Sequence, residues 1–220
     1  MERLSARKVG PRTRAATRAD LHSFLWRLFQ LPLYVAFLRA INVGGRTVRM
    51  TRLREVFESL GLTDVETFIA SGNVIFRSRS AKPAALEKSI ERELRKSLGF
   101  DVSTLIRTTP ELSSIASFEF PGSELPTSTL YVGLLKSMPD ATVRKEIVAL
   151  STPDDEFRVN GREIYWLSRA RSMASIGSAA RLEKSAGMPA TFRNVSTVRK
   201  LAEKYCERTR PRLRPGPRIE

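Results

Sequence analysis

Leu33-Tyr-Val-Ala-Phe-Leu38 returns later in the chain, with two changes, as Leu130-Tyr-Val-Gly-Leu-Leu135. Both stretches are rich in aliphatic and aromatic residues, a composition typical of β-strands. Each is followed by patterns that predict a helix, a strand, a tight turn and a returning strand. We therefore interpret the chain as a degenerate internal duplication of a β-α-β-β unit.

The first copy is complete in sequence. Its remaining predicted elements are helices over 51–60 and 83–98 and strands over 65–69, 74–77 and 102–106. The second helix begins at Pro83 and is closed by Gly99, since proline suits a first helical turn and glycine suits a C-terminal cap. The order is β-α-β-β-α-β, the split arrangement of ferredoxin-like folds. It predicts an antiparallel four-stranded sheet with both helices on one face.

The second copy follows the same order but fades after Leu167. Its predicted elements are a connecting helix over 110–118, strands over 130–135, 156–159 and 163–167, and helices over 140–150, 172–185 and 196–205. Asn160-Gly161 is a two-residue hairpin signal. No closing fourth strand is predicted. The fold class is α+β: two ferredoxin-like subdomains with antiparallel sheets, plus a C-terminal helix.

We expect four segments along the chain. They are a basic, poorly ordered N-terminal extension over 1–32, ferredoxin-like subdomains over 33–108 and 109–206, and a disordered Arg- and Pro-rich tail over 207–220. The net charge is +15 for all 220 residues and +7 for residues 33–205, so about half of the excess lies in the end segments. The remaining positive charge favours anionic ligands through its summed field.

Catalysis by histidine or cysteine is excluded in the folded part. The single histidine, His22, and the single cysteine, Cys206, both lie outside residues 33–205. This rules out Ser-His-Asp and Cys-His nucleophiles and zinc sites of Cys/His type, and we predict no metal and no cofactor. One cysteine suits a reducing cytoplasm, where we place the protein.

The apolar run near the N-terminus is not interpreted as a signal peptide or a membrane span. Arg27 and Gln30 interrupt it, Pro32 breaks it, and no small-residue cleavage site follows. We expect no membrane association.

The two copies differ most where the first strand joins the first helix. The second copy uses residues 136–139, whereas the first runs from Ala40 to about Met50. Connections of unusual length often carry function. A glycine pair before a helix N-terminus lets backbone N–H groups approach an anion, and arginines add charge. The candidate ligand-binding residues in this loop are Arg39, Asn42, Gly44, Gly45 and Arg46.

Two further segments complete the candidate site. In the split fold the end of the first strand and the turn between the second and third strands share one sheet edge. We therefore expect Ser71, Gly72 and Asn73 to approach the loop. Arg193 and Asn194, before the last helix, are candidate anion ligands. The alternative for each segment is structural: the glycines and the hairpin make turns, and Asn194 caps the helix.

Three motifs together resemble the bacterial domain of unknown function 1697 family. They are Arg39-Ala-Ile-Asn-Val-Gly-Gly45, Ser71-Gly-Asn-Val-Ile-Phe76 and Thr191-Phe-Arg-Asn-Val-Ser-Thr-Val-Arg-Lys-Leu201. The resemblance spans residues 33–206. It implies a pair of ferredoxin-like α+β subdomains in a small cytoplasmic protein, and it implies no activity, because the family is uncharacterised.

Three functions remain open. The first is binding of a phosphate-bearing or other anionic ligand, nucleotide or RNA, at the loop over 39–45. The second is a small enzyme that acts on a phosphorylated metabolite without His or Cys catalysis. The third is a protein-interaction or regulatory module that uses an exposed sheet edge. We expect a monomer in each case.

Stacking of RNA bases on the sheets is not favoured. The stretch Leu130–Leu135 is similar to the first strand signature of RNA-recognition motifs, but the partner signature is missing. We expect the strand aromatics to pack inside the protein instead. These are Tyr34, Phe76, Tyr131 and Trp166.

Overall fold

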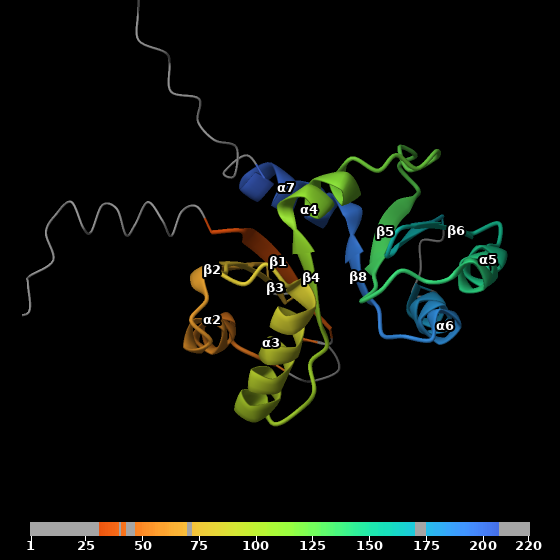
Figure 1. Cartoon of the computed structure of the whole chain (residues 1–220). Coiled ribbons are helices and arrows are strands. Elements are labelled where there is room, and N and C mark those ends of the chain that lie inside the picture. The colour runs from red at the N-terminus through yellow and green to blue at the C-terminus, as the bar shows by residue number, and fades with distance from the viewer. Residues whose placement is uncertain (1–30, 40, 43–46, 70–71, 170–174, 207–220) are drawn as a thin grey trace, which may run out of the picture. The chain divides into compact units, whose positions relative to one another are not determined.

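Two four-stranded antiparallel sheets organise the protein (Figure 1). This computed structural model describes residues 31–39, 41–42, 47–69, 72–169 and 175–206. The predicted N-terminal extension and C-terminal tail fall almost wholly outside these residues. Within them, no helix has both the length and the apolar character needed to cross a bilayer.

The first sheet has the strand order β2-β3-β1-β4. The elements of this half are β1 (Leu33–Leu38), α2 (Met50–Ser59), β2 (Thr63–Phe68), β3 (Asn73–Arg77), α3 (Pro83–Leu98), β4 (Thr104–Thr108) and α4 (Thr109–Ala116). The predicted ends of α3 are confirmed, because Pro83 begins the helix and Gly99 closes it with φ of 80°. β4 begins two residues later than predicted. The N–H of its first residue, Thr104, donates to Glu91 Oε1 at 2.8 Å.

The second sheet has the equivalent order, β6-β7-β5-β8. The elements of this half are β5 (Thr129–Leu134), α5 (Ala141–Ala149), β6 (Asp155–Asn160), β7 (Glu163–Ser168), α6 (Ser175–Ala186), β8 (Thr191–Asn194) and α7 (Val195–Cys206). The expectation that no fourth strand closes this half was wrong, since β8 pairs antiparallel with β5. The strand has only four residues, of which Phe192 alone is apolar, so its sequence lacks the usual strand pattern.

The fold class is confirmed as α+β with two ferredoxin-like halves, and each half adds a helix directly after its last strand. α4 follows β4 and α7 follows β8 without an intervening loop. The repeated unit is therefore β-α-β-β-α-β-α. The subdomain boundaries at 108/109 and 206 stay predictions.

The strands of the first sheet bury both faces. Along β1, Tyr34, Ala36 and Leu38 join the core formed with α2 and α3, as the period of two requires. Val35 and Phe37 point into a different core. Both helices of the split motif thus cover one face, as predicted, and the opposite face needs a second cover.

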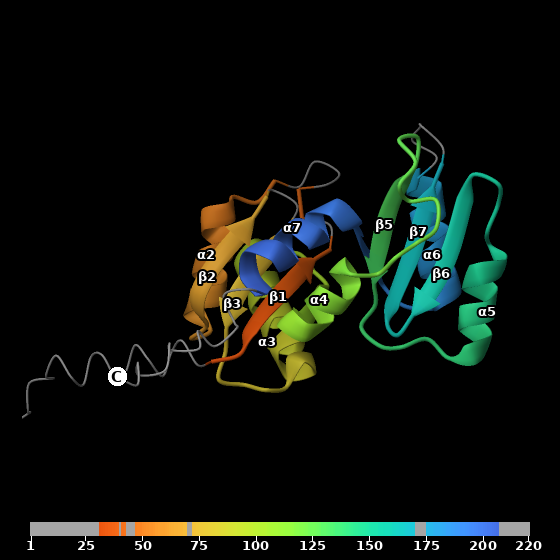
Figure 2. The ribbon, with the colours of Figure 1, turned by 90° about the horizontal axis from the view of Figure 1, so that it is seen from above.

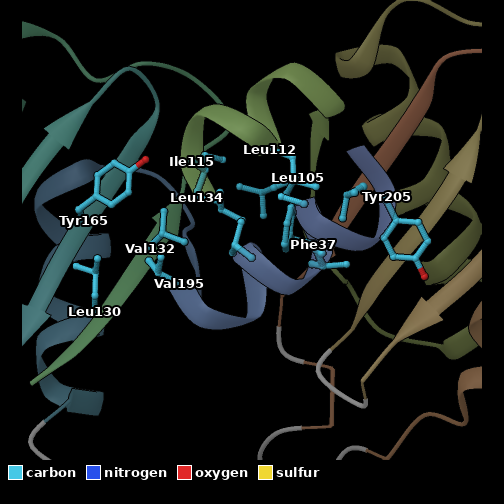
Figure 3. Packing of buried hydrophobic residues seen from close by; sticks show 14 of the residues in the cluster. Phe37, Leu105, Leu112, Ile115, Leu130, Val132, Leu134, Tyr165, Val195 and Tyr205 are labelled. Atoms are coloured by element: carbon cyan, nitrogen blue, oxygen red, sulfur yellow. The ribbon is translucent and has the colours of Figure 1, made fainter. Parts of the chain in front are cut away.

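That second cover is shared by the two halves. α4 and α7 lie side by side (Figure 1, Figure 2) and pack between the inner faces of both sheets. Figure 3 shows side chains from every part of this shared core: Phe37 and Leu105 from the first sheet, Val132 and Leu134 from the second, and Leu112 and Val195 from the helices. One continuous apolar cluster therefore joins the halves.

Candidate functional site

Three segments of the first half meet at one edge of its sheet. The N–H of Leu38 donates to Gly72 O at 2.8 Å, and the N–H of Arg39 donates to Ser103 O at 2.8 Å. Gly72 has φ of 72°, and a Cβ there would lie 3.0 Å from Ile41 Cβ. The loop after β1 and the β2–β3 turn therefore pack together. We call this edge the first rim, defined by residues 38–39, 41–42, 72–73 and 103.

Four of the candidate ligand residues fall outside the described part of the chain. They are Gly44, Gly45, Arg46 and Ser71. Their contribution to a ligand site stays a prediction.

The described residues beside these segments include two with unusual backbones. Asn42 has φ of 57° and Ile69 has φ of 52°, a region that costs energy for residues with a Cβ, above all a β-branched one. Asn42 Oδ1 accepts a hydrogen bond from the Val48 N–H at 2.7 Å, which ties the two ends of the loop before α2 together. Ile69 is 54% exposed. Asn42 thus forms a tight turn within the first rim, and Ile69 forms one beside it, at the end of β2.

Arg39 lies at the start of the loop and contacts the other half. Its Nε and Nη2 donate to the two carboxylate oxygens of Glu183 on α6, both at 2.9 Å. The side chains are 42% and 24% exposed. Glu183 Oε1 also accepts the N–H of Ala190 at 3.0 Å. This is a two-pronged guanidinium–carboxylate pair, the geometry that arginine also uses for phosphate.

Arg193 is partly buried and bonds to residues of the first rim. Its Nε donates to Asn73 Oδ1 at 2.7 Å, and its Nη2 donates to Leu38 O at 2.9 Å. Its Nη1 donates to Thr191 Oγ1 and to Phe192 O. Burial lowers the pKa of Arg193 to about 10, because desolvation disfavours its charged form. Arg193 and Asn73 thus join β8 of the second half to the first rim.

Arg107 makes the reverse contact, from the first half to the second. The sequence did not predict a role for it. Its Nε donates to Glu163 Oε1 at 2.7 Å, its Nη1 to Ile106 O at 3.0 Å and its Nη2 to Leu135 O at 2.9 Å. Arg107 is fully buried. Burial lowers its pKa, although the nearby Glu163 carboxylate opposes the shift.

The two arginines are equivalent under the duplication. Glu163 and Asn73 each begin the third strand of their half, and Leu135 and Leu38 hold matching places in the repeated stretches. Each arginine stands directly before the residue that precedes the last helix of its half. The sequence signal for these two equivalent arginines is an arginine followed by a single polar residue, Thr108 or Asn194, directly before a helix.

The second rim, residues 135–136 and 162–163, is filled by charged side chains of the protein itself. Arg162 Nη2 donates to Glu111 Oε1 at 2.7 Å, and Lys136 Nζ pairs with Glu91 Oε1 at 2.5 Å. Glu91 also accepts the N–H of Thr104, as Glu183 accepts that of Ala190. Lys136–Glu91 is therefore the counterpart of Arg39–Glu183.

Glu87 lies next to this network and is buried on α3. One of its oxygens accepts the Ile106 N–H at 2.8 Å. Desolvation raises its pKa, and the backbone hydrogen bond and the charges of Lys136, Arg162 and Arg107 oppose that shift. Among the described residues, no group of three or more His, Cys, Asp or Glu side chains is placed to hold a metal ion.

The first helices of the two halves begin differently. α5 is capped by Asp140, whose carboxylate accepts the Val143 N–H at 2.8 Å. α2 has Arg49 at its N-cap, makes no side-chain cap hydrogen bond and has no acidic residue in its first turn. The described part of α2 therefore presents the positive end of its helix dipole beside a basic side chain.

The remaining candidates have structural partners. Asn194 Oδ1 accepts the Ser196 N–H at 2.8 Å, which supports the capping alternative. Three of the four strand aromatics, Tyr34, Phe76 and Trp166, are buried as expected, and Tyr131 is partly buried. Tyr34 stacks on Phe76 with centroids 5.7 Å apart, and the rings of Tyr131 and Trp166 lie 4.9 Å apart. The sheets thus offer no row of exposed aromatic rings in the described residues.

Comparison with known proteins identifies the family and supports the fold. Residues 31–165 match the family described as Protein of unknown function (DUF1697), and the chain belongs to that family. The solved structure of the conserved bacterial protein SP0830 from Streptococcus pneumoniae is similar, with a TM-score of 0.63 and 23% sequence identity over 79% of this chain and 98% of that one. A search of curated proteins found no match.

Proposed function

We propose that this member of the DUF1697 family binds a phosphate-bearing ligand at the first rim, with the N-terminus of α2 as the anion contact. The observation that carries the proposal is the difference between α2 and α5. In the second half a carboxylate of the protein, Asp140, occupies the helix N-terminus. In the first half the N-cap residue of α2 is Arg49, whose side chain makes no capping hydrogen bond. A negatively charged group from outside would supply what Asp140 supplies in the second half.

The charges around the first rim support the same ligand class. Arg49 is exposed next to the helix end, and Arg39 lies at the start of the same loop. Arg193 adds a partly buried, desolvated positive charge that is linked to the rim through Asn73 and Leu38. An anion near a desolvated cation gains more than one near a solvated cation, because the local dielectric constant is lower.

The ligand would be recognised through its phosphate rather than through stacked bases. Recognition of single-stranded RNA commonly uses aromatic rings exposed on a sheet. Here Tyr34, Phe76 and Trp166 are buried. We therefore favour a nucleotide or another small phosphorylated molecule over an RNA strand, and we place the protein in the cytoplasm as a monomer.

An enzyme that acts on such a ligand is the second candidate. A buried glutamate with a raised pKa close to a lysine can transfer protons. Glu87 fits that description, with Lys136 among the charges that act on it. It lies by the second rim, and it accepts a backbone hydrogen bond that explains its presence structurally.

Thermal-shift measurements test the proposed function. We expect nucleotides or phosphosugars to raise the Tm of the full chain, and Arg49→Asp to abolish that rise, since the new carboxylate occupies the helix end. Arg54→Asp is the matched control, because it makes the same change of charge at an exposed arginine five residues further along. Stabilisation by every polyanion that disappears at high salt reflects bulk charge and contradicts the proposal. No response to any probe favours the protein-interaction module.

A further inference from the structure

The ion pair between Arg39 and Glu183 joins the proposed ligand site to the other half of the chain. The Arg39 backbone is fixed at the first rim, where its N–H donates to Ser103 O at 2.8 Å. Its guanidinium reaches α6 and meets both oxygens of the Glu183 carboxylate. The positive group nearest the start of the loop is thus already engaged by an anion of the protein.

The geometry of this pair is the geometry a ligand would use. Two parallel N–H···O bonds from one guanidinium suit a carboxylate and a phosphate equally well. At 42% side-chain exposure Arg39 is open to solvent, so an external anion can approach it. The exchange of one anionic partner for another costs little, because a partly exposed ion pair is worth only about 0.2–1 kcal/mol.

We propose that Glu183 is a built-in competitor of the anionic ligand for Arg39, so that a ligand must displace it to gain this arginine. The inference rests on the proposed function of the first rim. Glu183 has its own second partner, the Ala190 N–H, and keeps that hydrogen bond when Arg39 leaves. The side chain of Arg39 then turns towards the ligand while its backbone stays in place.

The second half provides a matched comparison. Lys136 and Glu91 form the equivalent pair between the halves, and Glu91 likewise accepts a backbone N–H, that of Thr104. This pair lies at the second rim, between Lys136 and Glu91 of α3. A general loosening of the contact between the halves would follow from breaking either pair, whereas release of Arg39 follows only from removing the charge of Glu183.

The experiment measures the Kd of inorganic pyrophosphate by calorimetry for the full chain and three variants. Glu183→Gln keeps the shape of the side chain and removes its charge. We expect binding to tighten by about 1.4- to fivefold, the range that corresponds to an exposed ion pair. We expect Glu91→Gln to leave the Kd unchanged. Arg39→Ala combined with Glu183→Gln should lose the gain.

Three other outcomes overturn the inference. Equal binding by the wild type and Glu183→Gln overturns it and leaves the proposed function intact. An equal gain in Glu91→Gln attributes the effect to loosening. Failure of every variant to bind overturns both the inference and the proposed function, whereas binding by Glu183→Gln alone supports both. Should Glu183→Gln not fold, Glu183→Asp, which shortens the reach of the carboxylate, replaces it, with the Tm without ligand as the check.

Discussion

Two arginine side chains form much of the polar contact between the halves. Arg107 and Arg193 each reach from one half to the other. Arg193 donates to β1 and β3, and Arg107 donates to β7 and to Leu135, directly after β5. Both are long and polar; Arg107 is fully buried and Arg193 partly buried, so their N–H groups need acceptors within the protein. The sequence suggested Arg193 as a ligand residue because an arginine before a helix looks available. Its burial depends on a contact with Leu38 and Asn73 that no local pattern encodes.

Replacement of Arg107 tests this role. We expect Arg107→Ala to lower the free energy of unfolding by about 3–5 kcal/mol, because the carboxylate of Glu163 would remain in a largely buried place without its partner. Arg95→Ala should change it by less than about 0.5 kcal/mol, since the Arg95–Asp101 pair is exposed. Urea denaturation followed by circular dichroism measures both. Similar losses in the two variants would show that the Arg107 network contributes no more than a surface pair.

The elements show which parts of the fold the sequence could predict. Helix α3 follows from local chemistry, with proline at its start, glycine at its end and apolar residues on one face. The hairpin at Gly161, with φ of 60°, follows from Asn160-Gly161 in the same way. Strand β8 could not be predicted, because its four residues become a strand only through their pairing with β5. For the candidate site, the length of the loop indicated the place, while the partners of Arg39 and Asn73 come from the distant half.

The caps of α2 and α5 give a prediction at this scale. Asp140→Ala should cost about 0.5–2 kcal/mol of unfolding free energy, because the Val143 N–H loses its acceptor. Arg49→Asp should instead stabilise the protein by about 0.5–1 kcal/mol, since a carboxylate at that N-cap can accept from N–H groups of the first turn and meets the positive end of the helix dipole. Thermal unfolding without ligand measures both. A loss of stability in Arg49→Asp would mean that the end of α2 is already satisfied.

The whole molecule is held together by one apolar cluster between its sheets. Phe37 of the first sheet and Val132 of the second belong to the same core, with α4 and α7 between them (Figure 3). Burial of apolar surface is the main source of folding stability, so the halves share much of what stabilises them. They should therefore unfold together.

A destabilising mutation in one half should lower the urea midpoint reported by a fluorescent probe in the other half. Leu53 is fully buried under the first sheet, and Leu53→Ala should cost about 2–5 kcal/mol. Trp166 lies in the core of the second sheet and, with Trp26 replaced by Phe, is the only tryptophan. We expect the urea midpoint reported by Trp166 fluorescence to fall by the same amount as that from circular dichroism. An unchanged Trp166 midpoint would show that the halves unfold independently.

The position of α7 at the end of the described chain has a consequence for synthesis on the ribosome. Val198, Leu201 and Tyr205 cover the inner face of the sheet that is made first, and the Tyr205 hydroxyl donates to Glu66 Oε2 of β2 at 2.8 Å. At roughly 5–20 residues per second, the part of that face that α7 covers stays without this helix for seconds after β4 and α4 have been translated. During this interval the nascent protein exposes an apolar, aggregation-prone surface. A chaperone that binds this surface would raise the yield of folded protein.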